Sequence, residues 1–396
     1  MKRTAATQRA WTGAGLWRNG FRAFFLGAGL WAVAAVAIWP MLFSGTVAIP
    51  TALTPVAWHV HEMLFGYGAA VIAGFLLTAI PNWTGRLPVA GWPLAALAAL
   101  WLAGRIAVFL SAWTGWVAAA VIDTAFLAVF ATVAAGEVAA GRNARNFKVV
   151  ALVALLALGN AAFHVEAALT GDAAIAGRAG IGVIVFLILL IGGRVVPSFT
   201  HNWLARVDHP CRPVPFGRAD AAVMVLSAGA LIPWIAGIGS PVTGGLLLLA
   251  GAANLWRLSR WRGWATRPDR LVLVLHAAFL LTAAGFLAAG AHVLAPDLIA
   301  AAAAIHIWAI GGIGMMTLAM MTRATLGHTG RALAAGPATQ AIYLGTAAAM
   351  LARVAVEFWP AAAMPLIHAA ALAWTMAFVG FVIVFGPMLA AAARKR

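Results

Sequence analysis

The feature that most constrains this chain is a series of twelve apolar runs, each about as long as a membrane-crossing helix. Such a helix needs roughly 20 mainly apolar residues. Of the 396 residues, 64% are hydrophobic and only 9% are charged, an excess of apolar surface that a water-soluble fold could not bury. We therefore predict a single all-α transmembrane domain (1–396) with spans at 24–43, 59–81, 89–110, 112–136, 147–169, 179–199, 218–236, 241–257, 270–293, 298–322, 337–358 and 363–390.

Lysine and arginine predict how these spans are oriented. Nearly all of them lie in the N-terminus, the C-terminus and the loops after even-numbered spans, whereas the other loops carry only Arg178. Loops rich in lysine and arginine stay in the cytoplasm, so both termini are predicted to be cytoplasmic. The net charge of +16 then reflects topology and does not indicate a nucleic-acid partner.

Three windows of the sequence suggest an internal repeat. Windows 61–86, 177–202 and 306–331 align without gaps, and they match in glycines, in threonines and in part in histidine, arginine and proline. The matches predict three four-helix units, 1–138, 139–260 and 261–396. Apolar sequence of low complexity also produces such matches by chance, so both interpretations stand.

Six ionisable residues are predicted to lie in the outer part of the membrane. One histidine at such a depth is commonly structural, but four at one depth favour a bound cofactor. The residues are His59, His61, His164, His306, Arg105 and Arg353.

Haem is the cofactor that this residue set favours. Imidazole ligates haem iron, and the two propionates need cationic partners where water is absent. We predict His61 and His306 as axial ligands and Arg105 and Arg353 as propionate partners. The only cysteine is Cys211, so no CxxCH attachment exists and the haem would be of the b type.

The residues beside His61 leave two interpretations open. His59 and Glu62 are three positions apart and would share one face of an ideal helix, where they could hold a second ion or orient another group. Alternatively, Glu62 is simply an acidic residue favoured by the dipole of a helix's first turn.

A second polar layer is predicted nearer the cytoplasm. Arg194 and Arg323 are expected to extend to the interface, whereas His276 and His328 are candidate ligands and His276 also a candidate proton relay. Asp123 is the only acidic residue near mid-membrane, which argues against a transporter driven by buried carboxylates.

The sequence resembles the NnrS family over nearly its whole length. The resemblance rests on "FRAFFLGA" (21–28), "WHVHEMLFGYGAAVIAGFLLTAIPNWTGR" (58–86), "WLAGRIA" (101–107), "IGGRVVPSFTHNW" (191–203), "VLHAAF" (274–279) and "GGIGMMTLAMMTRATLGHTGR" (311–331). It implies a multi-pass protein of the bacterial inner membrane that contains haem and copper and is linked to nitric oxide and nitrosative stress. It also implies recurrent polar positions, without dividing them between haem and copper: His59, His61, Glu62, His164, Arg194, His276, His306 and His328.

These observations lead to one functional prediction and two alternatives. The prediction is a b-type haem and copper protein that binds or turns over nitric oxide, using an unidentified electron donor, or that protects against nitrosative damage. The first alternative is a transporter of a small molecule, metal complex or nitrosyl species. The second is a haem sensor, although no soluble signalling domain is recognised in the sequence.

Overall fold

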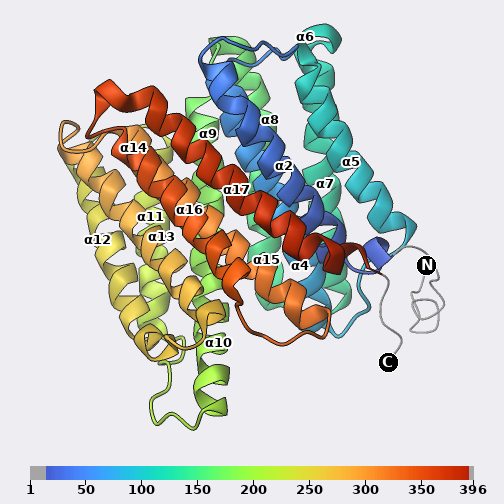
Figure 1. Cartoon of the computed structure of the whole chain (residues 1–396), viewed down its shortest axis with the longest axis vertical. Coiled ribbons are helices and arrows are strands. Elements are labelled where there is room, and N and C mark those ends of the chain that lie inside the picture. The colour runs from blue at the N-terminus through green and yellow to red at the C-terminus, as the bar shows by residue number, and fades with distance from the viewer. Residues whose placement is uncertain (1–14, 392–396) are drawn as a thin grey trace. The chain divides into compact units, whose positions relative to one another are not determined.

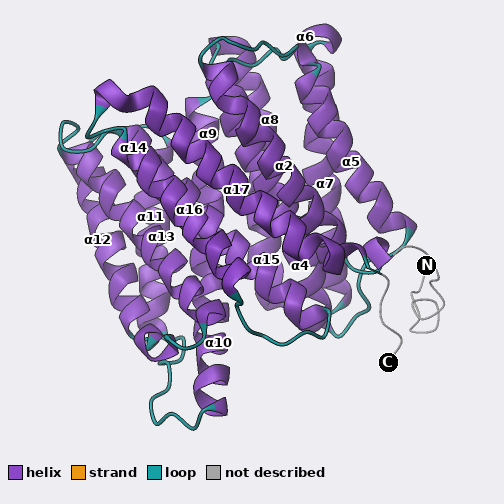
Figure 2. Cartoon of the chain, viewed as in Figure 1, coloured by secondary structure: helices purple, strands orange, loops and turns teal. Residues whose placement is uncertain are grey.

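The computed structural model describes residues 15–391, and the regular structure in that range is helical throughout (Figures 1 and 2). Ten helices there are long and apolar enough to cross a membrane. They are α2 (Gly20–Phe43); α3 (Pro55–His61), η2 (Glu62–Gly68) and α4 (Ala69–Thr84) as one segment; α5 (Trp92–Phe109); α7 (Trp116–Ala140); α8 (Phe147–Thr170) with η3 (Ala144–Asn146); α9 (Ala174–Leu187), η4 (Ile188–Gly192) and α10 (Gly193–Arg206) as one segment; α11 (Arg218–Ile235); α13 (Arg270–Leu294); α14 (Ala301–His306), η6 (Ile307–Gly314) and α15 (Met315–His328) as one segment; and α17 (Ala363–Ala390) with η7 (Pro360–Ala362).

Two further long helices coincide with predicted spans but are less apolar than these ten. They are α12 (Pro241–Ser259) and α16 (Pro337–Ala355). Polar residues lower their hydropathy, among them Arg257 in α12 and Arg353 in α16. The prediction of an all-helical membrane protein is thus confirmed, whereas the count of twelve spans stays a prediction.

The chain divides into two compact units. The described part of unit 1 runs up to Gly180 and includes two later pieces, Ala324–Arg331 and the residues from Phe378 onwards. Unit 2 contains Ile181–Arg323 and Ala332–Ala377. This division differs from the three four-helix units suggested by the sequence windows, so that repeat also stays a prediction.

Three of the long helices change to π-helix for part of their length. The segments are η2, η4 and η6, and they lie in the three helices that carry the sequence windows. The first and third begin at the residue after His61 and His306, whereas η4 begins much later in its window, at Ile188. π-Helical turns are rare and occur often at functional sites, because they shift side chains away from the positions of an α-helix.

The start and end of the second long helix fix the position of His61. The Thr54 side chain accepts a hydrogen bond from the Ala57 amide (3.3 Å), and Pro55 occupies the first turn, where its missing N–H has no consequence. At its other end, the helix terminates at Gly85, whose φ of +67° suits a residue without a side chain. His61 is therefore placed two turns inside a well-defined helix start.

Candidate metal centre

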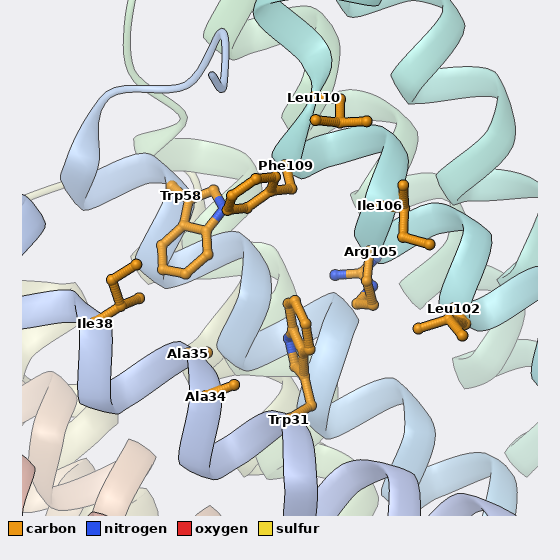
Figure 3. Close-up of a pocket in the computed structure, with 10 residues that line it drawn as sticks. All are labelled: Trp31, Ala34, Ala35, Ile38, Trp58, Leu102, Arg105, Ile106, Phe109 and Leu110. Atoms are coloured by element: carbon orange, nitrogen blue, oxygen red, sulfur yellow. The ribbon is translucent and has the colours of Figure 1, made fainter. Parts of the chain in front are cut away.

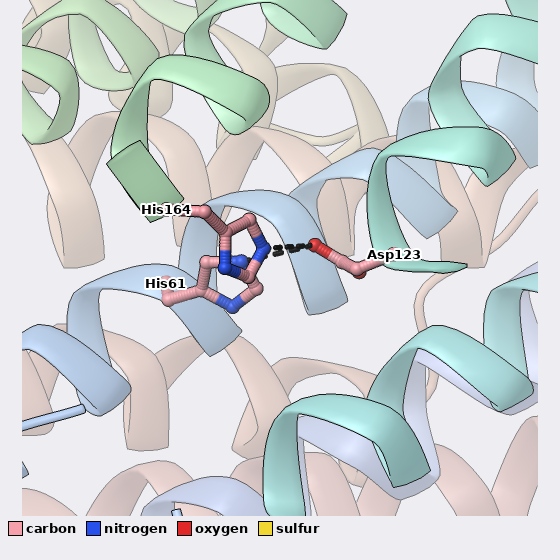
Figure 4. A group of neighbouring side chains, drawn as sticks. All are labelled: His61, Asp123 and His164. Carbon is pink, nitrogen blue, oxygen red and sulfur yellow. Dashed lines mark hydrogen bonds and ion pairs between the residues drawn. The ribbon is translucent and has the colours of Figure 1, made fainter. Parts of the chain in front are cut away.

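Three buried side chains from three helices meet in unit 1 (Figure 4). His61 ends α3, Asp123 lies in the first half of α7, and His164 lies in the second half of α8. Each offers one ligand atom, and these atoms all lie within 4.8 Å of one another. The side chains are at most 4% exposed, so water does not solvate the group.

His61 faces acceptor atoms on both sides of its ring. Its Nδ1 lies 3.0 Å from Glu62 Oε1, and its Nε2 lies 3.0 Å from both Asn160 Oδ1 and Asp123 Oδ2. A neutral imidazole carries only one N–H, so it can donate on only one side. On the other side of the ring, the lone pair of the nitrogen without a proton then faces the lone pairs of an oxygen. A proton or a metal cation between the two atoms would stabilise this arrangement.

Asp123 is the residue that joins the group. Its Oδ2 accepts a hydrogen bond from Asn160 Nδ2 (2.8 Å) and lies 3.1 Å from His164 Nε2. Its Oδ1 is paired with Arg105 Nη2. Arg105, on α5, also donates through Nη1 to Glu62 Oε2 at 2.6 Å, so one guanidinium bridges two carboxylates.

Two glycines allow this close approach. At Gly104 on α5, a β-carbon would lie 3.1 Å from the Asp123 Cα, so any side chain there would push α5 away from α7. At Gly66, in the π-helical segment, a β-carbon would lie 2.7 Å from Arg105 Nη1 and 2.8 Å from Glu62 Oε2. Absence of a side chain at both positions lets the arginine reach both acids.

The arrangement brings together several residues singled out in the sequence. His61, Glu62, His164 and Arg105 are in one connected network. His59 and Glu62 contact different groups: Glu62 contacts His61 and Arg105, while the His59 ring stacks on Trp39 with ring centroids 4.4 Å apart, and a second ion held by His59 and Glu62 stays a prediction.

The remaining predicted ligands lie outside this network. His328 is in unit 1, where its ring is 5.4 Å from that of Phe21. His276 is in unit 2, with its Nε2 2.8 Å from Thr200 Oγ1. His306 is also in unit 2, with its Nδ1 2.6 Å from the Ala302 carbonyl oxygen.

The fourth predicted haem contact is Arg353. It lies in α16 of unit 2 and is half-buried, and its Nη1 has no partner. The predicted pairing of His61 with His306 joins residues of different units and stays a prediction.

Sequence reasoning missed Asp123 and Asn160 as site residues. Asp123 had a usable signal, because an acid alone in the middle of an apolar helix is by default functional. Asn160 precedes His164 by four positions, so both side chains lie on one face of α8. An amide and an imidazole on one face of a membrane helix would have directed attention to a polar partner on another helix.

With this geometry in place, a comparison with protein-family models gives one match. The model of the NnrS protein family matches residues 15–392, nearly the whole chain. The chain belongs to the NnrS family. Comparison with curated proteins gives no match. In this NnrS family member the candidate centre is the buried group of His61, Asp123 and His164.

The donor set of this NnrS protein suits a transition-metal ion. Two imidazoles and one carboxylate form a set that iron(II), copper and zinc accept. Glu62 and Asn160 contact ligand residues and hold their orientation, which is the usual role of residues around metal ligands. The buried His–Asp–His group can thus hold a metal.

Proposed function

We propose that this membrane protein binds nitric oxide at a copper ion held by His61, Asp123 and His164, and so limits nitrosative stress. The observation that supports it most is three buried ligand atoms within 4.8 Å of one another, with acceptors on both sides of His61. Copper is proposed because imidazole and carboxylate ligands suit copper(II) and because the resemblance to the NnrS family implies copper.

The residues of the chain have separate roles in this proposal. His61, Asp123 and His164 would bind the ion, which would supply an open position for a small gas and a reversible electron. Arg105 and Asn160 hold Asp123 in place, and Glu62 holds the His61 ring through Nδ1. Burial excludes water, which strengthens every charge interaction in the network.

The contacts around His61 do not fit the predicted haem b. An axial bond from His61 Nε2 would require the ring to leave Asp123 and Asn160. Arg105 is bound to two carboxylates and would have to release them before it could contact a propionate. Haem bound by His61 and His306 with Arg105 and Arg353 stays a prediction, and the absorption spectrum of the purified protein tests it directly.

Placement in the bacterial inner membrane, with twelve spans and both termini in the cytoplasm, is part of the same proposal. It is supported by the ten apolar helices and by the distribution of lysine and arginine. Reporter fusions at the loops on either side of α12 and α16 would test the two spans in doubt.

Metal analysis of the purified full-length protein is the decisive experiment. We expect about one copper per chain, and a copper electron-paramagnetic-resonance signal that changes when nitric oxide is added. Asp123→Asn should abolish both. Asp220→Asn in unit 2, which also removes a buried acid from an arginine, is the matched control and should keep the copper.

Other outcomes assign the protein differently. Iron in place of copper would correct the metal but keep the site, and a Soret band would support haem. A metal-free, colourless protein that is insensitive to nitric oxide would contradict the proposal and favour the transporter alternative.

A further inference from the structure

Two features outside the candidate metal centre could receive a ligand. The first is a cavity of about 280 Å³ in unit 1, with walls from α2, α3 and α5 (Figure 3). Its walls are apolar apart from Arg105, whose Nη atoms are held by Glu62 and Asp123, so it offers a ligand little but apolar contact. The second is a group of exposed arginines in unit 2, where charge is available to a ligand.

These arginines lie on and beside two loops of unit 2 that contact each other. The loops are the segment after α10 (207–217) and the segment after α12 (260–269), which contains η5 (Gly263–Thr266). The Val214 amide donates to the Arg260 carbonyl oxygen (3.1 Å), and the centroids of the His209 and Trp264 rings are 6.2 Å apart. The two loops therefore form one surface at the same end of four helices (Figure 1).

Positive charge dominates this surface. The two loops and the helix ends beside them expose six arginines: Arg206, Arg212, Arg218, Arg262, Arg267 and Arg270. Between 206 and 220 and between 260 and 270 the only exposed acid is Asp208, since Asp220 and Asp269 are buried. Of the six arginines only Arg206 forms an ion pair with a described residue, at 3.8 Å from Asp269. The surface can therefore attract an anion.

Large aromatic rings are exposed among these arginines. Phe216 and Trp264 are both 55% exposed, and Trp256, in the last turn of α12, is 48% exposed. The Arg260 guanidinium lies 4.4 Å from the Trp256 ring centroid. Aromatic side chains of this kind concentrate where lipid meets water, because the ring is apolar and its tip is polar. Three of the four helices that end here, α10, α11 and α13, belong to apolar segments long enough to cross a membrane. The combination indicates a surface at the level of the lipid headgroups.

Anionic phospholipids fit such a surface better than soluble anions or acidic proteins do. A guanidinium can donate two parallel hydrogen bonds to a phosphate. Clusters of roughly four to eight basic residues at the ends of membrane helices attract anionic lipids, and each residue near the surface contributes about fivefold in affinity. The exposed rings would pack among lipid molecules, whereas an acidic protein has no use for them.

We propose that this surface of unit 2 binds the headgroup of an anionic phospholipid, with phosphate contacts from arginines of both loops. A phosphate between the loops would link them. The site is separate from the His–Asp–His group, which lies in unit 1, so it does not depend on the metal proposal.

Native mass spectrometry of the full-length protein in a non-ionic detergent, titrated with dioleoyl phosphatidylglycerol or dioleoyl phosphatidylcholine, tests this. We expect the unaltered chain to bind phosphatidylglycerol at least about tenfold more tightly than phosphatidylcholine. Arg262→Gln, Arg267→Gln and Arg270→Gln should each weaken phosphatidylglycerol binding about fivefold. The triple variant should lose the preference for the anionic lipid.

A second triple variant is the matched control. Arg142→Gln, Arg145→Gln and Lys148→Gln remove the same charge from exposed positions between α7 and α8 and at the start of α8, in unit 1. This chain should keep the preference for phosphatidylglycerol. Equal losses in the two triple variants would show that net charge alone attracts the lipid, and would overturn the proposal.

The remaining outcomes separate the lipid from its competitors. Equal binding of the two lipids by the unaltered chain would overturn the proposal. So would displacement of phosphatidylglycerol by an equal concentration of glycerol 3-phosphate, which would indicate a site for a soluble phosphate. A polyglutamate peptide that binds in place of the lipid, with the same dependence on the three arginines, would show a surface for an acidic protein instead. Metal content should be unchanged in both triple variants, so failure here and failure of the metal proposal are distinguishable.

Discussion

Two buried arginines, one in each unit, have opposite surroundings. Arg105 in unit 1 lies between two carboxylates, Glu62 and Asp123. In unit 2 the order is reversed, since Asp220 lies between Arg257 (3.2 Å) and Arg260 (3.3 Å). The first group has an excess of acceptors and the second an excess of cations.

The rest of each environment strengthens this contrast. Arg257 also donates to the Leu189 carbonyl oxygen (3.2 Å), and its guanidinium lies over the Trp261 and Phe279 rings at 5.4 and 5.9 Å. These contacts, together with Asp220, stabilise the Arg257 cation. Arg105 instead adjoins Asp123, whose remaining oxygen faces two imidazoles. The unit 1 network brings two imidazoles and a carboxylate together, whereas Asp220 is shared by two cations, so the charge arrangement favours a metal in unit 1.

The largest effect is expected when each acid is neutralised. Breaking a buried ion pair on one side commonly destabilises a protein by about 3–5 kcal/mol, so Asp123→Asn and Asp220→Asn should both lower the thermal midpoint. Only Asp123→Asn should also remove the metal. Thermal unfolding and metal analysis on one preparation check this. Metal loss in both variants would contradict the proposed difference between the surroundings of Arg105 and those of Arg257.

Removal of one imidazole is expected to act on the metal more than on the fold. His164→Gln keeps a hydrogen-bonding side chain near Asp123 but replaces a nitrogen ligand. Metal affinity should fall by more than roughly a hundredfold, with a smaller change in the thermal midpoint. His368→Gln on α17, at an exposed histidine, is the control for histidine loss as such. Competition with a chelator gives the affinities, and equal values for the two variants would contradict the assignment.

Substitution of Glu62 should have an intermediate effect on metal affinity. It contacts His61 and Arg105 but is outside the His–Asp–His group, so Glu62→Gln should lower metal affinity roughly 10–100-fold while the metal still binds. His59→Gln, three residues earlier, should change affinity little because His59 stacks on Trp39. The reverse ranking of the two variants would restore the sequence-based pairing of His59 with Glu62.

The smallest expected effect is on stability, at the close approach of α5 and α7. A β-carbon at Gly104 would crowd the backbone of Asp123, so Gly104→Ala should destabilise unit 1 by about 1–3 kcal/mol. Gly136→Ala, on α7 with open space around the new methyl group, should be neutral or slightly stabilising. Denaturation in detergent measures the stability of both variants. An unchanged free energy of unfolding in Gly104→Ala would mean that the contact between α5 and α7 has space for a methyl group.

The sequence was sufficient to predict the helices, because long apolar runs have few alternatives once water is excluded. It was also sufficient to select His61, His164 and Arg105, since ionisable groups inside such runs are rare. It did not identify their partners, because an arginine suits a propionate as well as it suits Asp123. The π-helix at Glu62 was equally out of reach: the residues of η2 are compatible with α-helix, and only packing decides between the two.

Arg22 carries a consequence for how the molecule is made. It lies near the start of α2, and its Nη1 donates to the carbonyl oxygens of Met388 (3.1 Å), Leu389 (2.9 Å) and Ala391 (2.8 Å) at the end of α17. Gly29 also packs α2 directly against Phe381. Because α2 precedes α17 by more than 300 residues, the Arg22 side chain is synthesised long before these acceptors. This contact within unit 1 therefore forms only after the residues of α17 have been synthesised.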